Sequence, residues 1–182
     1  MPFLPRAVMP WRRKEKASQK LYGAIVAQAR LPVFYRGYGV PDTLEGRFVV
    51  LSLNLFVVLH RLKAEGGEAL LQSQELADRF KDDMETVLRE LGVSDLRVPK
   101  TMRALAASSA ALLKAYERAF AGGEAQLASA IADALPLDKG AAEAAGLRLA
   151  HYVRQCIRSL EAEPYPAIKA GTLVFPRVSA PC

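Results

Sequence analysis

The longest apolar stretch of the chain runs from Phe48 to Leu59, where ten of twelve residues are apolar. Ser52 and Asn54 interrupt it, and because each helical residue turns by about 100°, the two lie about 200° apart and not on one face. A helix without a polar face has to be enclosed by protein or by lipid. The run is shorter than the roughly 20 apolar residues needed to cross a bilayer. The pattern therefore predicts a central helix wrapped by other helices.

Local signals define the ends of this helix. Asp42 follows a proline and is a good N-cap, with Glu45 at the third helical position, as in a capping box. The alternation of Leu51–Leu55 also fits a strand, but the length of the run and its flanks favour a helix. Cations, which the helix dipole favours at the C-terminal end, stand there ahead of a glycine pair: His60, Arg61 and Lys63.

Helical spacing of apolar residues recurs along the rest of the chain. It predicts an all-α fold: a single-domain bundle of about six helices around the buried central helix, with irregular N- and C-terminal tails. We expect a basic flexible tail over 1–17, a helical domain over 18–163 and an irregular tail over 164–182, with residues 33–41 as a loop. The helices predicted besides the central one begin at Ser18, capped by that serine, and span Glu68–Leu91, Pro99–Ala121, Glu124–Leu135 and Ala141–Ala162.

Composition agrees with a globular domain, since 51% of the 182 residues are hydrophobic and 24% are charged. The net charge of +6 is concentrated in the first 20 residues. Aromatic and basic residues interleaved there suit anionic lipid or RNA phosphates, and a disordered solubilising tail or a transit peptide are the alternatives. The residues predicted to make this membrane or RNA contact are Arg6, Trp11, Arg12, Arg13, Lys14 and Lys16.

No recognisable catalytic or metal-binding pattern is present in the sequence. The two cysteines, Cys156 and Cys182, form no framework, which favours a reducing compartment, and no continuous apolar stretch of a secretory signal precedes the first charges. His60 and His151 each lack a second ligand three or four residues away. No nucleophile elbow, phosphate-binding loop or dinucleotide fingerprint occurs. We therefore expect no metal, no cofactor and no enzymatic activity, and a protein that works by binding.

Two stretches combine glycine, proline and charge in a way that suits a binding surface: Tyr38–Phe48 and Gly92–Lys100. For the first, the plainer interpretation is a helix cap with a salt bridge from Arg47 to a neighbouring turn. For the second, it is an ordinary link between helices. The aromatic residues Phe34, Tyr35 and Tyr38 are either anchors beneath a neighbouring helix or part of a contact surface.

Together these stretches resemble the ubiquinol–cytochrome c chaperone family. The likeness rests on Tyr38–Leu62, where PDT and GRF precede a long apolar helix ending in His-Arg-Leu, and on the link that follows the second long helix. The supporting residues are Leu88–Val93, Asp95-Leu96, Val98-Pro99-Lys100 and, less specifically, Tyr152-Val153-Arg154. The resemblance implies an all-helical, non-catalytic chaperone for newly made cytochrome b during assembly of ubiquinol–cytochrome c reductase, together with a small assembly-factor partner.

The family likeness predicts how the molecule works. An apolar groove or loop surface would hold a hydrophobic segment of the unassembled client, with contact near the ribosome or the inner membrane through the basic tail and with no role for DNA. We expect a bacterial protein on the cytoplasmic side of the inner membrane, the mitochondrial matrix being the alternative. The predicted partner-binding residues are Phe34, Tyr35, Tyr38, Asp42, Arg47, Arg97 and Lys100.

Two other classes of function stay open on the sequence. The first is a carrier of a small ligand, a quinone or a haem, or an enzyme, using an apolar cavity of the bundle, because such a pocket needs no motif. The second is a scaffold subunit without a client.

Overall fold

The computed structural model describes residues 10–94 and 96–179, with side chains from residue 17 onward. Within these ranges the chain forms eight helices and no strand, so the all-α prediction is confirmed. Two of the helices are single short turns, and the other six are the main helices of one helical body. The helices are α1 Pro10–Ala29, α2 Pro32–Arg36, α3 Leu44–Glu65, α4 Glu68–Glu90, α5 Val98–Gly122, α6 Glu124–Ala134, α7 Lys139–Glu161 and α8 Tyr165–Lys169.

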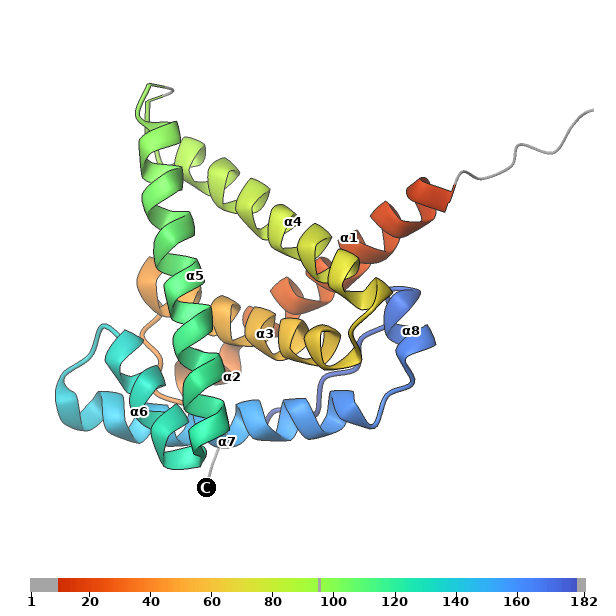
Figure 1. Cartoon of the computed structure of the whole chain (residues 1–182). Coiled ribbons are helices and arrows are strands. Elements are labelled where there is room, and N and C mark those ends of the chain that lie inside the picture. Colours follow the sequence, from red (N-terminus) through yellow and green to blue (C-terminus); the bar gives the residue numbers. More distant parts are fainter. Residues whose placement is uncertain (1–9, 95, 180–182) are drawn as a thin grey trace, which may run out of the picture.

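Helix α3 lies in the middle of the molecule, as its apolar run predicts. It contacts α1 and α4 on one side and α5 and α7 on others, and α7 passes below it in Figure 1. Every residue from Ser52 to Val58 is buried. Because no face of this segment is polar, helices have to pack on it from all directions.

A buried hydrogen-bond network joins three of these helices. The Asn54 amide donates to the Val50 carbonyl at 2.9 Å and accepts from the Tyr152 hydroxyl at 2.6 Å. The same hydroxyl accepts from Gln28 at 3.1 Å. A buried polar group costs free energy unless it is paired, so the network ties α1 and α7 to one position along α3.

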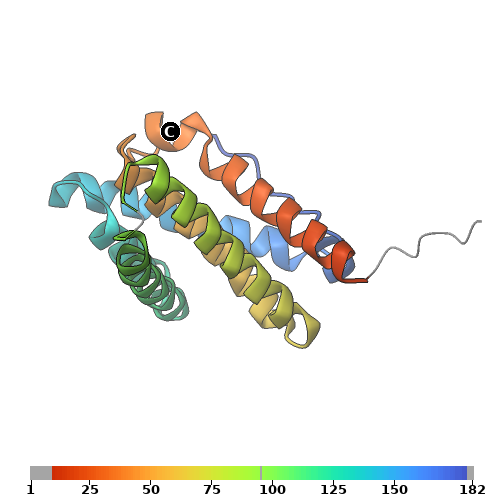
Figure 2. The same ribbon diagram turned by 90° about the horizontal axis from the view of Figure 1, so that it is seen from above.

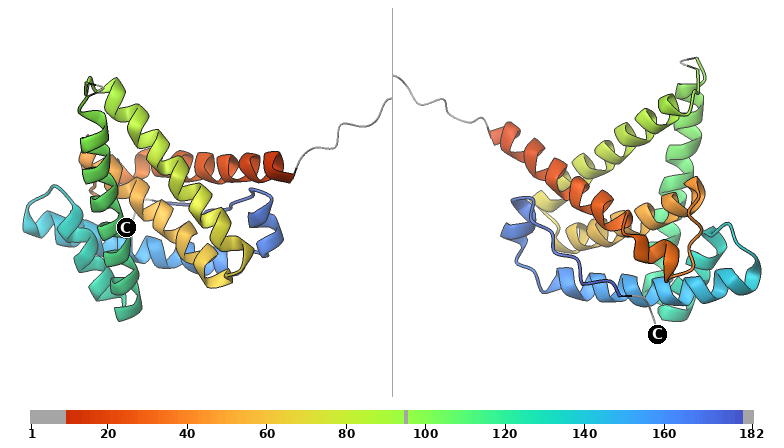
Figure 3. Two further views of the ribbon diagram at one scale, coloured as in Figure 1. Left: turned by 45° about the horizontal axis from the view of Figure 1, so that its top comes forward. Right: turned by 180° about the vertical axis from the view of Figure 1, so that it is seen from behind.

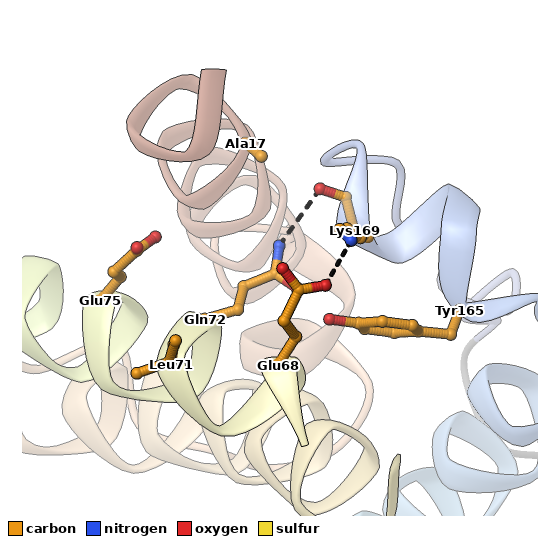
Figure 4. Close-up of a pocket in the computed structure, with 7 residues that line it drawn as sticks. All are labelled: Ala17, Glu68, Leu71, Gln72, Glu75, Tyr165 and Lys169. Atoms are coloured by element: carbon orange, nitrogen blue, oxygen red, sulfur yellow. Dashed lines mark hydrogen bonds and ion pairs between the residues drawn. The ribbon is translucent and has the colours of Figure 1, made fainter. Parts of the chain in front are cut away.

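The C-terminal segment folds back over the start of the chain. After α8 it runs beside α1, as Figures 2 and 3 show. Gly171 lies so close to α1 that a Cβ there would be 3.0 Å from the Ala17 carbonyl oxygen. Gln72 of α4 donates to the carbonyls of Ile168 and Lys169, and the Lys169 ammonium pairs with Glu68 (Figure 4). The cavity at this junction, about 30 Å³, holds no more than a water molecule.

Several predicted element ends are wrong in detail. Helix α1 begins at Pro10 and not at Ser18, because proline fits the first turn of a helix and no further proline occurs between Pro10 and Pro32. Ser18 is consequently buried inside the helix and donates to Glu75. Thr43, not Asp42, caps α3 by accepting from the Gly46 amide at 3.2 Å.

The two short helices also fall in segments that were predicted to be irregular. Helix α2 replaces part of the expected loop, since Pro32 begins a helical turn. Helix α8 lies within the expected C-terminal tail, where Pro166 has the same effect. The division into 1–17, 18–163 and 164–182 stays a prediction, although its first boundary falls inside α1.

We expect Gly146→Ala to destabilise the protein by about 1–3 kcal/mol, because overpacking strains a filled core. A Cβ at Gly146 of α7 would lie 2.5 Å from the Ala128 carbonyl oxygen of α6. The matched control is Gly23→Ala, where nothing lies within 4 Å of the added carbon; it should stabilise helix α1 by about 0.5–1 kcal/mol. Urea unfolding of both variants measures the difference, and equal effects would contradict the close approach of α6 and α7.

Candidate binding groove

A cavity of about 610 Å³ lies between α1, α3, α4 and α5. Its walls are apolar side chains from all four helices, and we call it the apolar groove. The residues that define it here are Val26, Phe48, Leu51, Val87, Leu88 and Leu105.

The groove exists because α4 and α5 are covered unequally along their length. Their apolar faces follow a regular helical spacing, and α4 packs on α1 and α3 while α5 reaches α6. Between these supports Val87, Leu88 and Leu105 are only half-buried. Leu44 and Leu91 at the edge are 54% and 58% exposed. The groove is therefore open to solvent and is not an enclosed internal cavity.

One end of the groove carries a charged pair over an aromatic ring. The Asp42 carboxylate accepts from the Arg47 guanidinium at 2.6 Å, and this hydrogen bond lowers the pKa of Asp42. The guanidinium carbon lies 5.6 Å from the centre of the Tyr35 ring, within cation–π range. Tyr35 is fixed in turn, since its hydroxyl donates to the Ala29 carbonyl at 2.8 Å. These groups belong to the polar part of a mainly apolar surface, and the other charged residues that line it are Arg30, Glu45 and Asp83.

A second polar contact fixes the wall made by α1 and α4. The Tyr22 hydroxyl donates to the Asp83 carboxylate at 2.8 Å. Burial, together with this hydrogen bond, raises the pKa of Tyr22 far above its usual value. The phenol therefore stays protonated and remains a donor, so the spacing of the two helices is held at the groove.

Two of the predicted contact residues belong to the core. Phe34 is fully buried and Tyr38 is 8% exposed. Their rings lie 5.4 Å apart, and Phe34 meets Tyr152 of α7 edge-on at 5.0 Å. Because both side chains are enclosed, a partner could reach them only after local opening, and their assignment to a partner-binding surface stays a prediction. They anchor α2 on α7, which was the plainer interpretation.

The remaining predicted residues fall in separate places. Tyr35 and Arg47 line the groove, and Asp42 is paired with Arg47 beside it. Arg97 and Lys100 are exposed where α5 begins, and neither lines the groove. The contact of Arg47 with Asp42 is the salt bridge near the helix start that the plainer interpretation predicted.

The predicted membrane or RNA contacts fall outside the described side chains. Arg6 precedes the described residues altogether. The backbone of the others belongs to α1, and these residues are Trp11, Arg12, Arg13, Lys14 and Lys16.

Residues of α4 and α5 that line the groove were missed as binding residues. The sequence places Val87, Leu88 and Leu105 on the buried faces of their helices, and the structure leaves them partly uncovered. No helix among the residues placed by the structure is long and apolar enough to span a bilayer. Within the same ranges, no three His, Cys, Asp or Glu side chains gather as a metal site would require.

Comparison with known proteins adds to this geometry. A family model described as "Ubiquinol-cytochrome C chaperone" matches residues 36–175, most of the chain. The chain belongs to this family. The resemblance that the PDT, GRF and VPK stretches indicated is thus confirmed, and with it membership in a family of assembly chaperones for ubiquinol–cytochrome c reductase, complex III.

Two relatives show how far the family likeness extends. One is the Cbp3 homolog from Brucella abortus, whose crystal structure is known. It is 36% identical in sequence to this protein, and the two structures superpose with a TM-score of 0.78. That match covers 92% of this chain and 94% of the Brucella chain. The ubiquinol-cytochrome-c reductase complex assembly factor 1 of Xenopus laevis is 24% identical over 115 residues. The latter match covers 63% of this chain and 58% of the Xenopus protein, less than two thirds of its length.

We expect the stability of the protein to fall as the pH rises above about 9. Burial raises the pKa of the Cys156 thiol, beside Tyr152, to about 12. The unfolded thiol loses its proton from about pH 9 while the folded one keeps it, so the unfolded state binds fewer protons and gains stability. Urea unfolding at a series of pH values should show a shallower decline for Cys156→Ala. An identical slope would contradict the burial of this thiol.

We expect Arg47→Glu to leave the free energy of unfolding nearly unchanged, because exposed ion pairs contribute little. Arg61 is the matched contrast on the same helix. Its side chain is 11% exposed and donates to the carbonyls of Leu160 and Glu163. Arg61→Glu should therefore cost at least about 2 kcal/mol, since buried charged hydrogen bonds are lost. Comparable losses in urea unfolding would show that Arg47 has a structural role.

Proposed function

We propose that this protein is a non-catalytic assembly chaperone that holds an apolar segment of newly made cytochrome b in the apolar groove during biogenesis of complex III. The proposal rests on one observation: a member of this chaperone family has an open apolar groove with a volume of about 610 Å³. The name of the Xenopus relative, an assembly factor for the same complex, supports it.

The shape and chemistry of the groove suit one face of a helix. Amphipathic or apolar helices bind in grooves through side chains spaced three or four residues apart. Leu51, Leu88 and Leu105 offer such side chains a surface from three different helices. The exposed leucines Leu44 and Leu91 line the edge of the same cavity and add to the apolar surface that a client segment would contact.

The charged pair at one end of the groove would set the direction in which the client segment binds. Asp42 and Arg47 are both more than half exposed, so either can exchange its present partner for a polar group of the client. The low cost of opening an exposed pair favours this exchange. Tyr35 beneath the guanidinium adds a rigid aromatic contact of the kind that is frequent at binding hot spots.

The other partners follow from the family and the charge distribution. A small assembly-factor protein would act together with this chain. The basic residues Arg6, Arg12 and Arg13 and their neighbours would bring it to the ribosome or to the cytoplasmic face of the inner membrane. These contacts stay predictions.

A carrier of a small apolar ligand is the second candidate, because the groove volume lies within the range of about 300–1,000 Å³ typical of small-molecule pockets. A quinone would need only the apolar walls. A haem would need an axial ligand, and Met84 is the sulfur-bearing residue along the groove. Solvent extraction and visible absorption of protein purified from its native host test this candidate, since a stoichiometric quinone or haem would favour it over the chaperone.

Site-specific photo-crosslinking tests the proposed function directly. A benzoyl-phenylalanine introduced at Leu51 or Leu105 should crosslink to cytochrome b when the two proteins are made together. The same residue at the exposed Leu147 of α7 is the matched control and should not. Arg47→Glu should reduce the crosslinked fraction while the protein stays folded. Crosslinks from Leu147 alone, or to no cytochrome b at any position, would overturn the proposal.

A further inference from the structure

The junction of α4 and α5 carries a second exposed surface, which we call the hairpin tip and define by Leu96, Arg97, Lys100 and Arg103. Helix α4 rises from the body and α5 returns to it, so the junction lies far from α7 in Figures 1 and 3. Leu96 is 95% exposed, more than any other large apolar residue that the structure describes. Single exposed apolar residues are common on protein surfaces, so Leu96 indicates an interaction surface only together with the charged residues around it.

Three basic residues surround this leucine. Arg97, Lys100 and Arg103 are all exposed, and none has an ion-pair partner among the residues that the structure places. Arg97 is the N-cap residue of α5, and Lys100 and Arg103 lie within its first two turns. The nearby acidic residue of the link, Asp95, lies outside the described ranges. The tip thus combines one protruding apolar group with three exposed basic side chains.

We propose that the hairpin tip binds an anionic lipid surface, with Leu96 inserted among the acyl chains and the three basic side chains at the phosphate groups. Basic side chains attract anionic lipid, and their long apolar stems can lie along the interface while the charges stay hydrated. An apolar residue between them supplies the hydrophobic part of the same contact.

The shape of the tip favours lipid over a protein partner. A protein that accepted Leu96 would have to provide a pocket of matching shape, and none of the four tip residues lines the apolar groove or the small cavity beside α8. A fluid bilayer interface accepts a single protruding side chain without matching shape. Charge complementarity with anionic headgroups then gives the selectivity.

The hairpin tip lies next to one end of the apolar groove. The walls of the apolar groove include Val87 and Leu88 of α4 and Leu91 directly after it, and the chain runs from there to the tip. A molecule that touches the bilayer with Leu96 therefore brings the open end of the groove near the membrane surface. The lipid contact itself requires no client, so it stands or falls independently of the proposed function.

Vesicle flotation with the full chain tests the proposal. Vesicles of phosphatidylglycerol and phosphatidylcholine in equal parts should bind the protein, and vesicles of phosphatidylcholine alone should bind it less. Replacing Arg97, Lys100 and Arg103 by glutamine should weaken binding about fivefold per charge. The matched control replaces the exposed Lys114, Arg118 and Arg158. Equal losses in the two triple variants would overturn the proposal, because net charge alone would then explain the attraction.

Fluorescence shows whether the tip itself enters the bilayer. The chain has a single tryptophan, Trp11, so Leu96→Trp in a Trp11→Phe background is a unique probe. Its emission should shift to the blue with the mixed vesicles and be quenched by brominated lipids. Leu70→Trp, at the far end of α4 and also exposed, should show neither effect. No shift at position 96, or a shift only with detergent-solubilised cytochrome b, would overturn the lipid contact in favour of none or of a protein contact.

Discussion

The side chain of Asn54 lies enclosed in the apolar middle of α3, and the arrangement of the other helices depends on satisfying it. An uncompensated buried amide costs several times more than an ordinary hydrogen bond contributes. Tyr152 of α7 and Gln28 of α1 complete the network that meets this need. Apolar packing alone tolerates sliding of one helix along another, whereas this network has one register. The groove inherits its shape from that register, since α1 and α3 form two of its walls.

The molecule separates a closed core from an open surface. Around α7 the aromatic rings of Phe34, Tyr38 and Tyr152 fill the interior. On the side of α4 and α5 the apolar faces are left half-covered, and leucines reach solvent. A chaperone for apolar segments requires both properties. The closed core keeps the protein folded, while the open part would offer the proposed client a surface resembling its final protein environment.

The fold was predictable because an apolar run such as that of α3 has few ways to be buried. The helix ends were harder to predict from the sequence. Pro10 can begin a helix or break one, and the helix that it begins is held by contacts of Ala17 and Ser18 with distant residues. Phe34 and Tyr38 look the same in sequence whether they anchor a loop or bind a partner, and their ring contacts with Tyr152 join them to a residue far along the chain. The groove is a gap between helices, and Leu105 has the same spacing whether it faces a neighbour or a gap.

The partners of α3 come from distant parts of the sequence, with 98 residues separating Asn54 from Tyr152. During translation α3 therefore leaves the ribosome well before α7 exists to cover it. During that interval the nascent chain has an exposed apolar helix, which resembles the membrane segments that the finished protein is proposed to bind. A protein of this design would itself be a substrate for general holding factors until its last long helix has been made.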